Sequence, residues 1–188
     1  MSVEVSTLSN GLRVVTDAVP HLESASVGVW VDVGARYETP EVNGVAHLLE
    51  HMAFKGTRRR DARAIATEIE AVGGHLNAYT GREHTAYYAR VLKADVPLAV
   101  DILGDILQHS VFDPTELERE RHVVLQEIGQ AEDTPDDIIF DHLQAASYPD
   151  QPLGWSILGT EATVGGMSRD ALAGFMGGHY RAERMVLV

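Results

Sequence analysis

The sequence contains no cysteine in its 188 residues. This absence excludes a disulfide framework, a thiolate nucleophile, and any zinc or iron–sulfur site built on cysteine. A metal bound to this chain would therefore need histidine or carboxylate ligands. The sequence supplies candidates for both types, with 9 histidines and 28 acidic residues.

Basic residues are scarce, with 15 Lys and Arg against 28 Asp and Glu and a formal net charge of -13. A nucleic-acid surface needs clustered cations, so we expect no nucleic-acid partner. The basic run at residues 58–60 is interpreted as a solvated turn. The acidic charge would favour basic partners through its field, although simple solubility explains it equally well.

Long apolar runs are also missing. No stretch approaches the roughly 18 apolar residues of a membrane-spanning helix, so we expect no membrane partner. Residues 1–15 lack the basic segment and apolar run typical of a secretory signal. The expected localisation is therefore cytoplasmic.

The length and the 45% hydrophobic content fit a single globular domain, taken as residues 1–188. Its last residues, 185–188, are apolar and have the pattern of a strand, whereas most chains end in a polar tail. We therefore expect the sequence to be part of a longer protein. A short natural terminal strand is the alternative.

Hydrophobic periodicity predicts both strands and helices. Residues 26–33 alternate, with valines on one face, as in a half-buried strand. Further strands are expected at residues 11–16, 75–80, 84–92 and 184–188, the middle two forming a hairpin around Gly81. Helices are expected at residues 45–54, 62–72, 96–109, 114–131, 135–147 and 169–176. Together these elements predict an α+β fold, with a largely antiparallel sheet packed against helices.

Signals at the ends of these helices support the boundaries. Asp113, followed by proline and then glutamate, is typical of a helix start. Asn43 or Gly44 is expected to cap the helix at residues 45–54. Residues 154–166 are expected to be mostly loop.

The segment HLLEH at residues 47–51 carries the strongest chemical signal. On a helix, His47, Glu50 and His51 project from one face. Two imidazoles one turn apart can reach the same tetrahedral metal ion. Glu50 would then lie close enough to accept a proton from a metal-bound water. The alternative is an ordinary pair of surface or core histidines.

A catalytic zinc site takes three protein ligands and keeps one position open. The helix after Asp113 offers several glutamates, of which Glu120 and Glu127 fall on one face. Glu127 lies among apolar residues, where a carboxylate is costly unless it has a partner. For Glu116 and Glu118 a solvated helix face is the simpler interpretation.

The motif HxxEH is the inverzincin signature. With further segments, the sequence resembles the pitrilysin/insulinase family of zinc metallopeptidases over essentially its whole length, and within it the processing-peptidase branch and its bacterial relatives. These segments are NGLRV (10–14), GAR (34–36), GVA (44–46), MAFKGT (52–57), HLNAYT (75–80), ERER (118–121) and HY (179–180).

The resemblance implies a role for each residue of the constellation. His47, His51 and Glu127 would be the ligands of Zn²⁺, and Glu50 would be the general base of peptide hydrolysis. Glu120 matches a second acidic position that supports the catalytic site, by orienting His51.

The resemblance also implies how substrate binds. Asn77 and Ala78 match an edge strand that holds the substrate backbone by β-augmentation. Asn77 would also hydrogen-bond a substrate carbonyl near the scissile bond. Judged from the residues alone, Asn77 is better interpreted as a turn residue at a strand end.

Members of this family have two similar halves that close like a clamshell around a peptide. The resemblance therefore implies that this chain is the N-terminal catalytic half of a zinc endopeptidase acting on extended peptides or precursor segments. Its partner would be a C-terminal half or a second subunit, in a possible homo- or heterodimer, and the isolated half would be weak or inactive. The alternatives are a non-catalytic subunit of the same fold and an unrelated metal-storage or sensor domain.

Overall fold

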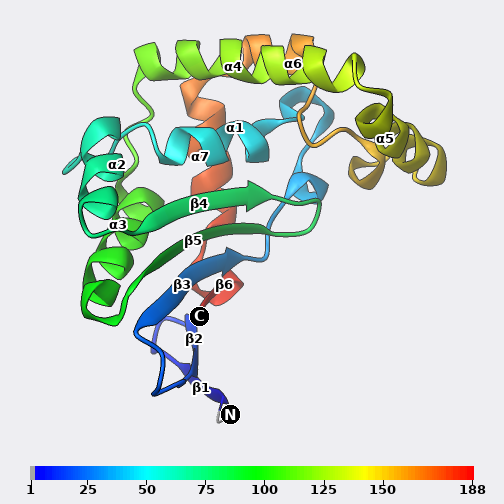
Figure 1. Ribbon diagram of the computed structural model, residues 1–188. Coiled ribbons are helices and arrows are strands. Elements are labelled where there is room, and N and C mark those ends of the chain that lie inside the picture. Colours follow the sequence, from blue (N-terminus) through cyan, green and yellow to red (C-terminus); the bar gives the residue numbers. More distant parts are fainter. Residues whose placement is uncertain (1–2) are drawn as a thin grey trace.

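The computed structural model describes residues 3–188, which form one sheet with helices gathered above and beside it (Figure 1). The strands are β1 (Val3–Thr7), β2 (Arg13–Asp17), β3 (Ser24–Val31), β4 (His75–Thr80), β5 (Thr85–Leu92) and β6 (Met185–Leu187). Their order is β1-β2-β6-β3-β5-β4, with β2 and β6 parallel and the other neighbours antiparallel. The predicted α+β class is confirmed.

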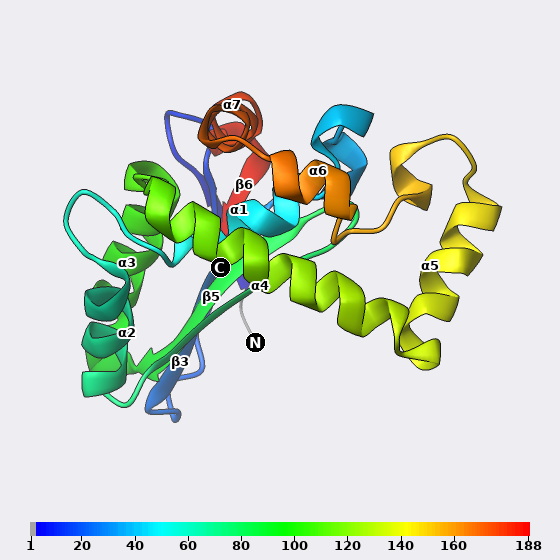
Figure 2. The same cartoon turned by 90° about the horizontal axis from the view of Figure 1, so that it is seen from above.

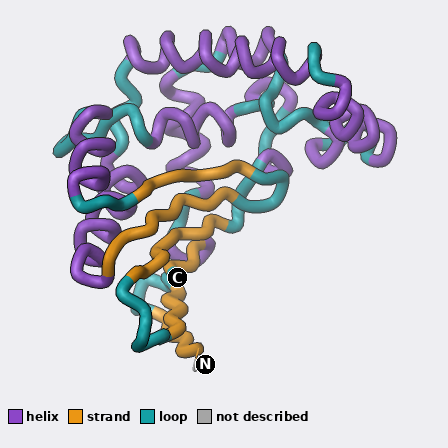
Figure 3. Tube along the Cα trace, in the orientation of Figure 1, coloured by secondary structure: helices purple, strands orange, loops and turns teal. Residues whose placement is uncertain are grey.

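The helices account for most of the remaining chain. They are α1 (Val45–Ala53), α2 (Ala62–Ala71), α3 (Val96–His109), α4 (Pro114–Glu132), α5 (Pro135–Ser147), α6 (Glu161–Gly166) and α7 (Arg169–His179). From above, α4 crosses over α1 and runs on to α5 (Figure 2). The Cα trace shows the strands as one block beneath α4, with β1 and β2 farthest from it (Figure 3). Within residues 3–188, no helix has the length and apolar character needed to cross a membrane.

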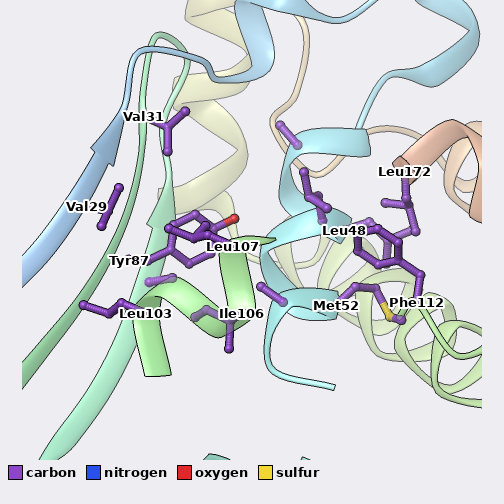
Figure 4. Packing of buried hydrophobic residues seen from close by; sticks show 14 of the residues in the cluster. Val29, Val31, Leu48, Met52, Tyr87, Leu103, Ile106, Leu107, Phe112 and Leu172 are labelled. Carbon is purple, nitrogen blue, oxygen red and sulfur yellow. The ribbon is translucent and has the colours of Figure 1, made fainter. Parts of the chain in front are cut away.

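The core lies on the valine face of β3. Val27, Val29 and Val31 are buried, as the alternating pattern predicts. Val29 pairs with Tyr87 of β5, whose side chain is fully buried among residues of α3 (Figure 4). Burial of this face fixes the strand register, because a slip of one residue would turn the valines to solvent.

Helix α1 is almost entirely enclosed by this core. Leu48, Leu49 and Met52 are buried on one side of it, which leaves its polar residues to face α4. Its N-cap is Gly44, which is one of the two predicted capping residues. Gly44 has a φ of 92° and provides no side-chain hydrogen bond. The cap is completed by the buried Glu38, whose carboxylate accepts hydrogen bonds from the backbone N–H of Gly44 at 2.8 Å and of Ala46 at 2.9 Å.

Helix α4 begins where the sequence predicts. The Asp113 carboxylate accepts hydrogen bonds from the backbone N–H groups of Thr115 and Glu116. Val124 and Ile128 are buried and belong to the same core as α1. This packing turns one face of α4 toward the polar face of α1.

Two short elements were not expected from the sequence. Strand β1 forms although all of its residues are exposed, because it pairs along its whole length with β2. Helix α6 lies within the expected loop at residues 154–166. A capping box between Thr160 and Thr163 starts it, and the buried Val164 anchors it to the core.

The interpretation of residues 58–60 as a solvated turn is wrong for Arg60. Its side chain is only 10% exposed and forms ion pairs with Glu68, Asp101 and Asp105. Arg59 also pairs with Asp101. These ion pairs, of which only the one with Asp105 reaches a buried carboxylate, tie α2 and α3 to the loop that follows α1.

Candidate active site

The candidate site is built first on one face of α1. His47 and His51 lie one turn apart, with ring centroids 4.6 Å from each other. Their side chains are only 14% and 18% exposed, so the protein covers most of both rings. The buried leucines between them anchor the opposite face of the helix, which holds the two rings in place.

Glu127 of α4 completes a cluster with these histidines. Its Oε2 atom lies 3.7 Å from Nε2 of His47 and 3.7 Å from Nε2 of His51. One donor atom from each residue falls within 4.8 Å of the others. Donor atoms around a tetrahedral zinc lie about 3.4 Å apart, given zinc–ligand bonds of about 2.1 Å. The spacing therefore fits a single metal ion at the centre of the three.

The protonation of His47 also fits metal binding. Burial, and then the neighbouring His51, lower the pKa of His47 to about 4. The ring is therefore neutral near pH 7, which is the form that ligates metals. Within residues 3–188, Nδ1 of His47 is a buried side-chain atom without a hydrogen-bond partner. The nitrogen that faces Glu127 is the other one, Nε2.

Glu120 stands behind His51, two turns before Glu127 on α4. It is only 6% exposed. Its Oε2 lies 3.0 Å from Nδ1 of His51, and its Oε1 lies 2.8 Å from Nζ of Lys55. Glu120 contacts His51 from behind and is not one of the three residues whose donor atoms form the cluster.

Glu50 lies on the same face of α1 and is held by the neighbouring sheet. Thr80, the last residue of β4, donates a hydrogen bond from Oγ1 to Glu50 Oε2 at 2.5 Å. Burial raises the pKa of Glu50, and Thr80 and His51 partly oppose the increase. A carboxylate with a raised pKa beside a metal position is suited to receiving a proton.

Asn77 and Ala78 lie on β4, at the edge of the sheet. β4 pairs with β5 along one side, and the described residues place no strand on its other side. Ala78 is buried, whereas Asn77 is exposed and accepts a hydrogen bond from the Ala78 N–H at 2.8 Å. In the described part of the chain, Asn77 forms no hydrogen bond to the histidine cluster. The strand edge that β-augmentation requires is present.

Three residues that shape the site were not predicted from the sequence. Thr80 holds Glu50, Lys55 contacts Glu120, and Glu38 caps α1. Thr80 and Lys55 stand in segments that resemble the family, but neither contains a pattern that assigns a partner. Glu38 is an isolated acidic residue in a loop, and only the fold brings its carboxylate to the N-terminus of α1.

The chain resembles known proteins in both sequence and fold. The family model for insulinase (peptidase family M16) matches residues 13–161. The chain belongs to this family. It is 51% identical over 185 residues to mitochondrial-processing peptidase subunit beta of Lentinula edodes, covering 98% of this chain and 40% of that protein. An uncharacterized zinc protease of Bacillus subtilis is 45% identical over 181 residues, covering 96% of this chain and 44% of that protein.

Solved structures of insulinase-family and protease chains share the fold. A protease from Helicobacter pylori superimposes with a TM-score of 0.94 at 24% identity, covering 99% of this chain and 45% of that one. A peptidase M16 inactive domain from Pseudomonas fluorescens gives a TM-score of 0.93 at 18% identity, covering 100% of this chain and 46% of that one. At such identities the likeness establishes the fold alone. The chain thus spans less than half the length of each of these four proteins.

Proposed function

We propose that the chain is the zinc-binding, N-terminal catalytic half of a metalloendopeptidase. The observation that carries this proposal is the convergence of His47, His51 and Glu127 from two helices, with one donor atom of each within 4.8 Å of the others. Family membership supports a peptidase, and several relatives are named as zinc proteases. Hydrolysis of extended peptides or precursor segments is the activity proposed for the complete protein.

His47, His51 and Glu127 would hold the zinc ion. When bound, zinc lowers the pKa of a water molecule to about 7 and polarises the peptide carbonyl. The side chain of Glu127 is 38% exposed, so solvent and substrate can reach the ligand set from this side. Glu120 orients His51 from behind through the contact with Nδ1.

Glu50 is proposed as the general base. Its carboxylate takes the proton of the attacking water and later returns it to the leaving amine. Thr80 fixes one carboxylate oxygen, which leaves the other free to exchange this proton. Burial raises the pKa of the Glu50 carboxyl above its usual value, which makes its carboxylate a stronger base than that of an exposed glutamate.

The free edge of β4 is proposed to bind the substrate backbone as an added strand. Extended peptides pair with such an edge through main-chain hydrogen bonds, which supply affinity whatever the side chains. Asn77 and Ala78 would provide part of this edge. Thr80 lies on the same strand and donates a hydrogen bond to Glu50, so a peptide paired with β4 would lie next to the proposed general base.

A second half is proposed as partner, either later in the same polypeptide or on another subunit. The chain covers 40% of the Lentinula edodes relative and 44% of the Bacillus subtilis relative. The name of the former assigns it to one subunit of a processing peptidase. The 188-residue half is therefore expected to bind zinc but to cleave peptides weakly or not at all. We retain the cytoplasm as the proposed localisation.

A non-catalytic subunit of the same fold is less well supported. The Pseudomonas fluorescens domain, whose title calls it inactive, shows that this fold does not by itself imply catalysis. Here, however, the two histidines and Glu127 converge, and Glu50 stands beside them with a hydrogen-bond partner. This arrangement supports the catalytic alternative.

Replacement of Glu50 tests the mechanism. In the full-length protein, Glu50→Gln is expected to lower kcat at least about 100-fold, since general acid–base catalysis contributes roughly that much or more. Zinc content should stay unchanged because Glu50 is not a ligand. Glu116→Gln, at a partly exposed position of α4, is the matched control and should retain activity. Unchanged turnover in Glu50→Gln would refute the assigned role.

A further inference from the structure

Lys55 has no role in the function proposed above, yet it belongs to the same set of contacts. It lies one turn beyond His51, just after the end of α1. Its ammonium group is 2.8 Å from Oε1 of Glu120, and its side chain is 30% exposed. His51 and Lys55 therefore approach the same glutamate from two successive turns.

Glu120 needs both of these partners. It is 6% exposed, and a carboxylate so deeply buried is costly unless its oxygens are hydrogen-bonded. Oε2 faces Nδ1 of His51 at 3.0 Å, and Oε1 faces Lys55. Without Lys55, one oxygen would lose its ionic partner, and the carboxylate would be free to rotate away from the histidine.

We propose that Lys55 is a positioning residue that holds Glu120 against His51 and thereby fixes the ring for metal binding. The Glu120 carboxylate only accepts hydrogen bonds, so Nδ1 of His51 must carry the hydrogen. The lone pair is then on Nε2, the atom that faces Glu127 at 3.7 Å. Partners behind a ligating histidine set its tautomer and orientation in this way. This inference rests on the proposed zinc site.

The backbone around Lys55 is fixed, as the role requires. Its N–H donates to the carbonyl oxygen of Met52 at 3.2 Å, which continues the end of α1. Two residues later, Thr57 donates from Oγ1 to the buried Asp105 at 2.8 Å. The loop is thus tied to α3, and the ammonium group of Lys55 is held near Glu120 rather than carried on a mobile chain.

Zinc affinity of the full-length protein tests the proposal, measured by competition with a chromophoric chelator. Lys55→Met is expected to weaken binding about tenfold, the lower end of the range for residues behind metal ligands. Glu120→Gln should weaken it at least as much, and Lys55→Met combined with Glu120→Gln should be no worse than Glu120→Gln alone. Lys55→Arg, which keeps the ion pair, should recover most of the affinity. Circular dichroism checks that each variant is folded.

The matched control is Lys93→Met, because Lys93 forms a lysine–glutamate pair that is exposed on the surface, at 60% and 72%. It should leave zinc affinity unchanged. Full affinity in Lys55→Met, or additive losses in the double variant, would overturn the proposal. So would a rise in KM with unchanged zinc affinity, which would make Lys55 a substrate contact. If the wild-type protein binds no zinc at His47 and His51, the proposed function fails before this inference is tested.

Discussion

Glu50 stands where α1 meets the end of β4, and one hydrogen bond links the two. Thr80 donates this hydrogen bond from Oγ1 to Oε2 of Glu50. A general base must point at the proton that it takes, so a freely rotating carboxylate would lose much of its effect. The hydroxyl of Thr80 thus orients the carboxylate that is proposed as the general base.

Removing this hydroxyl gives a prediction for a single residue. Thr80→Val should lower kcat of the full-length protein about tenfold, because a hydrogen bond to a charged group is worth roughly 1.5 kcal/mol. Zinc content should not change. Thr16→Val makes the same replacement at an exposed position of β2 and serves as the control. Steady-state kinetics with a peptide substrate measure both, and equal kcat values for Thr80→Val and wild type would contradict the orienting role.

Some residues of the candidate site could be predicted from the sequence, and others could be assigned only from the structure. His47, Glu50 and His51 share a helix face, and helical period alone brings them together, so sequence sufficed to group them. Glu127 comes from another helix, and its assignment as the third ligand followed only from the family resemblance. Thr80 meets Glu50 through the packing of a strand end on a helix. No local rule encodes such a contact, so it required the structure.

At the scale of elements, α1 depends on how its first turn is fixed. Gly44 adopts φ of 92°, and a Cβ atom there would lie 2.8 Å from the carbonyl oxygen of Leu158. Behind it, Glu38 accepts two backbone hydrogen bonds of the first turn. The start of the helix that carries both histidines is therefore set by a loop and a buried carboxylate.

Substitution of this glycine tests the importance of the helix start. Gly44→Ala should destabilise the protein by about 2–4 kcal/mol, since left-handed backbone and close packing each add a penalty. Gly129→Ala, within α4 and with nothing within 4 Å of the added methyl, should be neutral or stabilising by up to about 1 kcal/mol. Chemical denaturation compares the two. If Gly44→Ala and Gly129→Ala had the same free energy of unfolding, the backbone geometry at Gly44 would not contribute to stability.

Most elements could be predicted because their burial follows a simple period. β3 and α1 carry regular apolar patterns, and Asp113 marks the start of α4 through its side chain. β1 could not be recognised because both of its faces are exposed and its order comes from pairing with β2. α6 is short and ends in two glycines, so the packing of Val164 decides its conformation.

At the scale of the whole molecule, a buried ionic network joins the segments that surround the site. Asp105 of α3 is 2% exposed and accepts hydrogen bonds from Thr57 and Arg60. Burial alone would raise the pKa of Asp105, but these hydrogen bonds and the charge of Arg59 outweigh it and hold the pKa below its usual value. The ionised carboxylate is therefore part of the folded state.

This network makes a prediction about stability and pH. Asp105→Ala should cost about 3–5 kcal/mol at pH 7, because it leaves Arg60 buried without this partner. The lowered pKa means that the carboxylate stabilises the fold above pH 3.8, its usual pKa, and loses that effect as the pH falls through the folded value. The difference in the free energy of unfolding between variant and wild type should thus shrink below about pH 4. Urea unfolding at each pH measures this difference, and a difference that grows as the pH falls below about 4 would contradict the assignment.

His47, His51 and Glu127 are proposed to hold one zinc ion. Elemental analysis of the full-length protein, purified without added chelator, tests this most directly. The wild type should contain about one zinc per chain, as should Glu118→Gln, an exposed position on the same helix as Glu127. Glu127→Gln should lose most of the metal while remaining folded. A wild-type protein without zinc, or Glu127→Gln with its full complement, would contradict the assignment of the site.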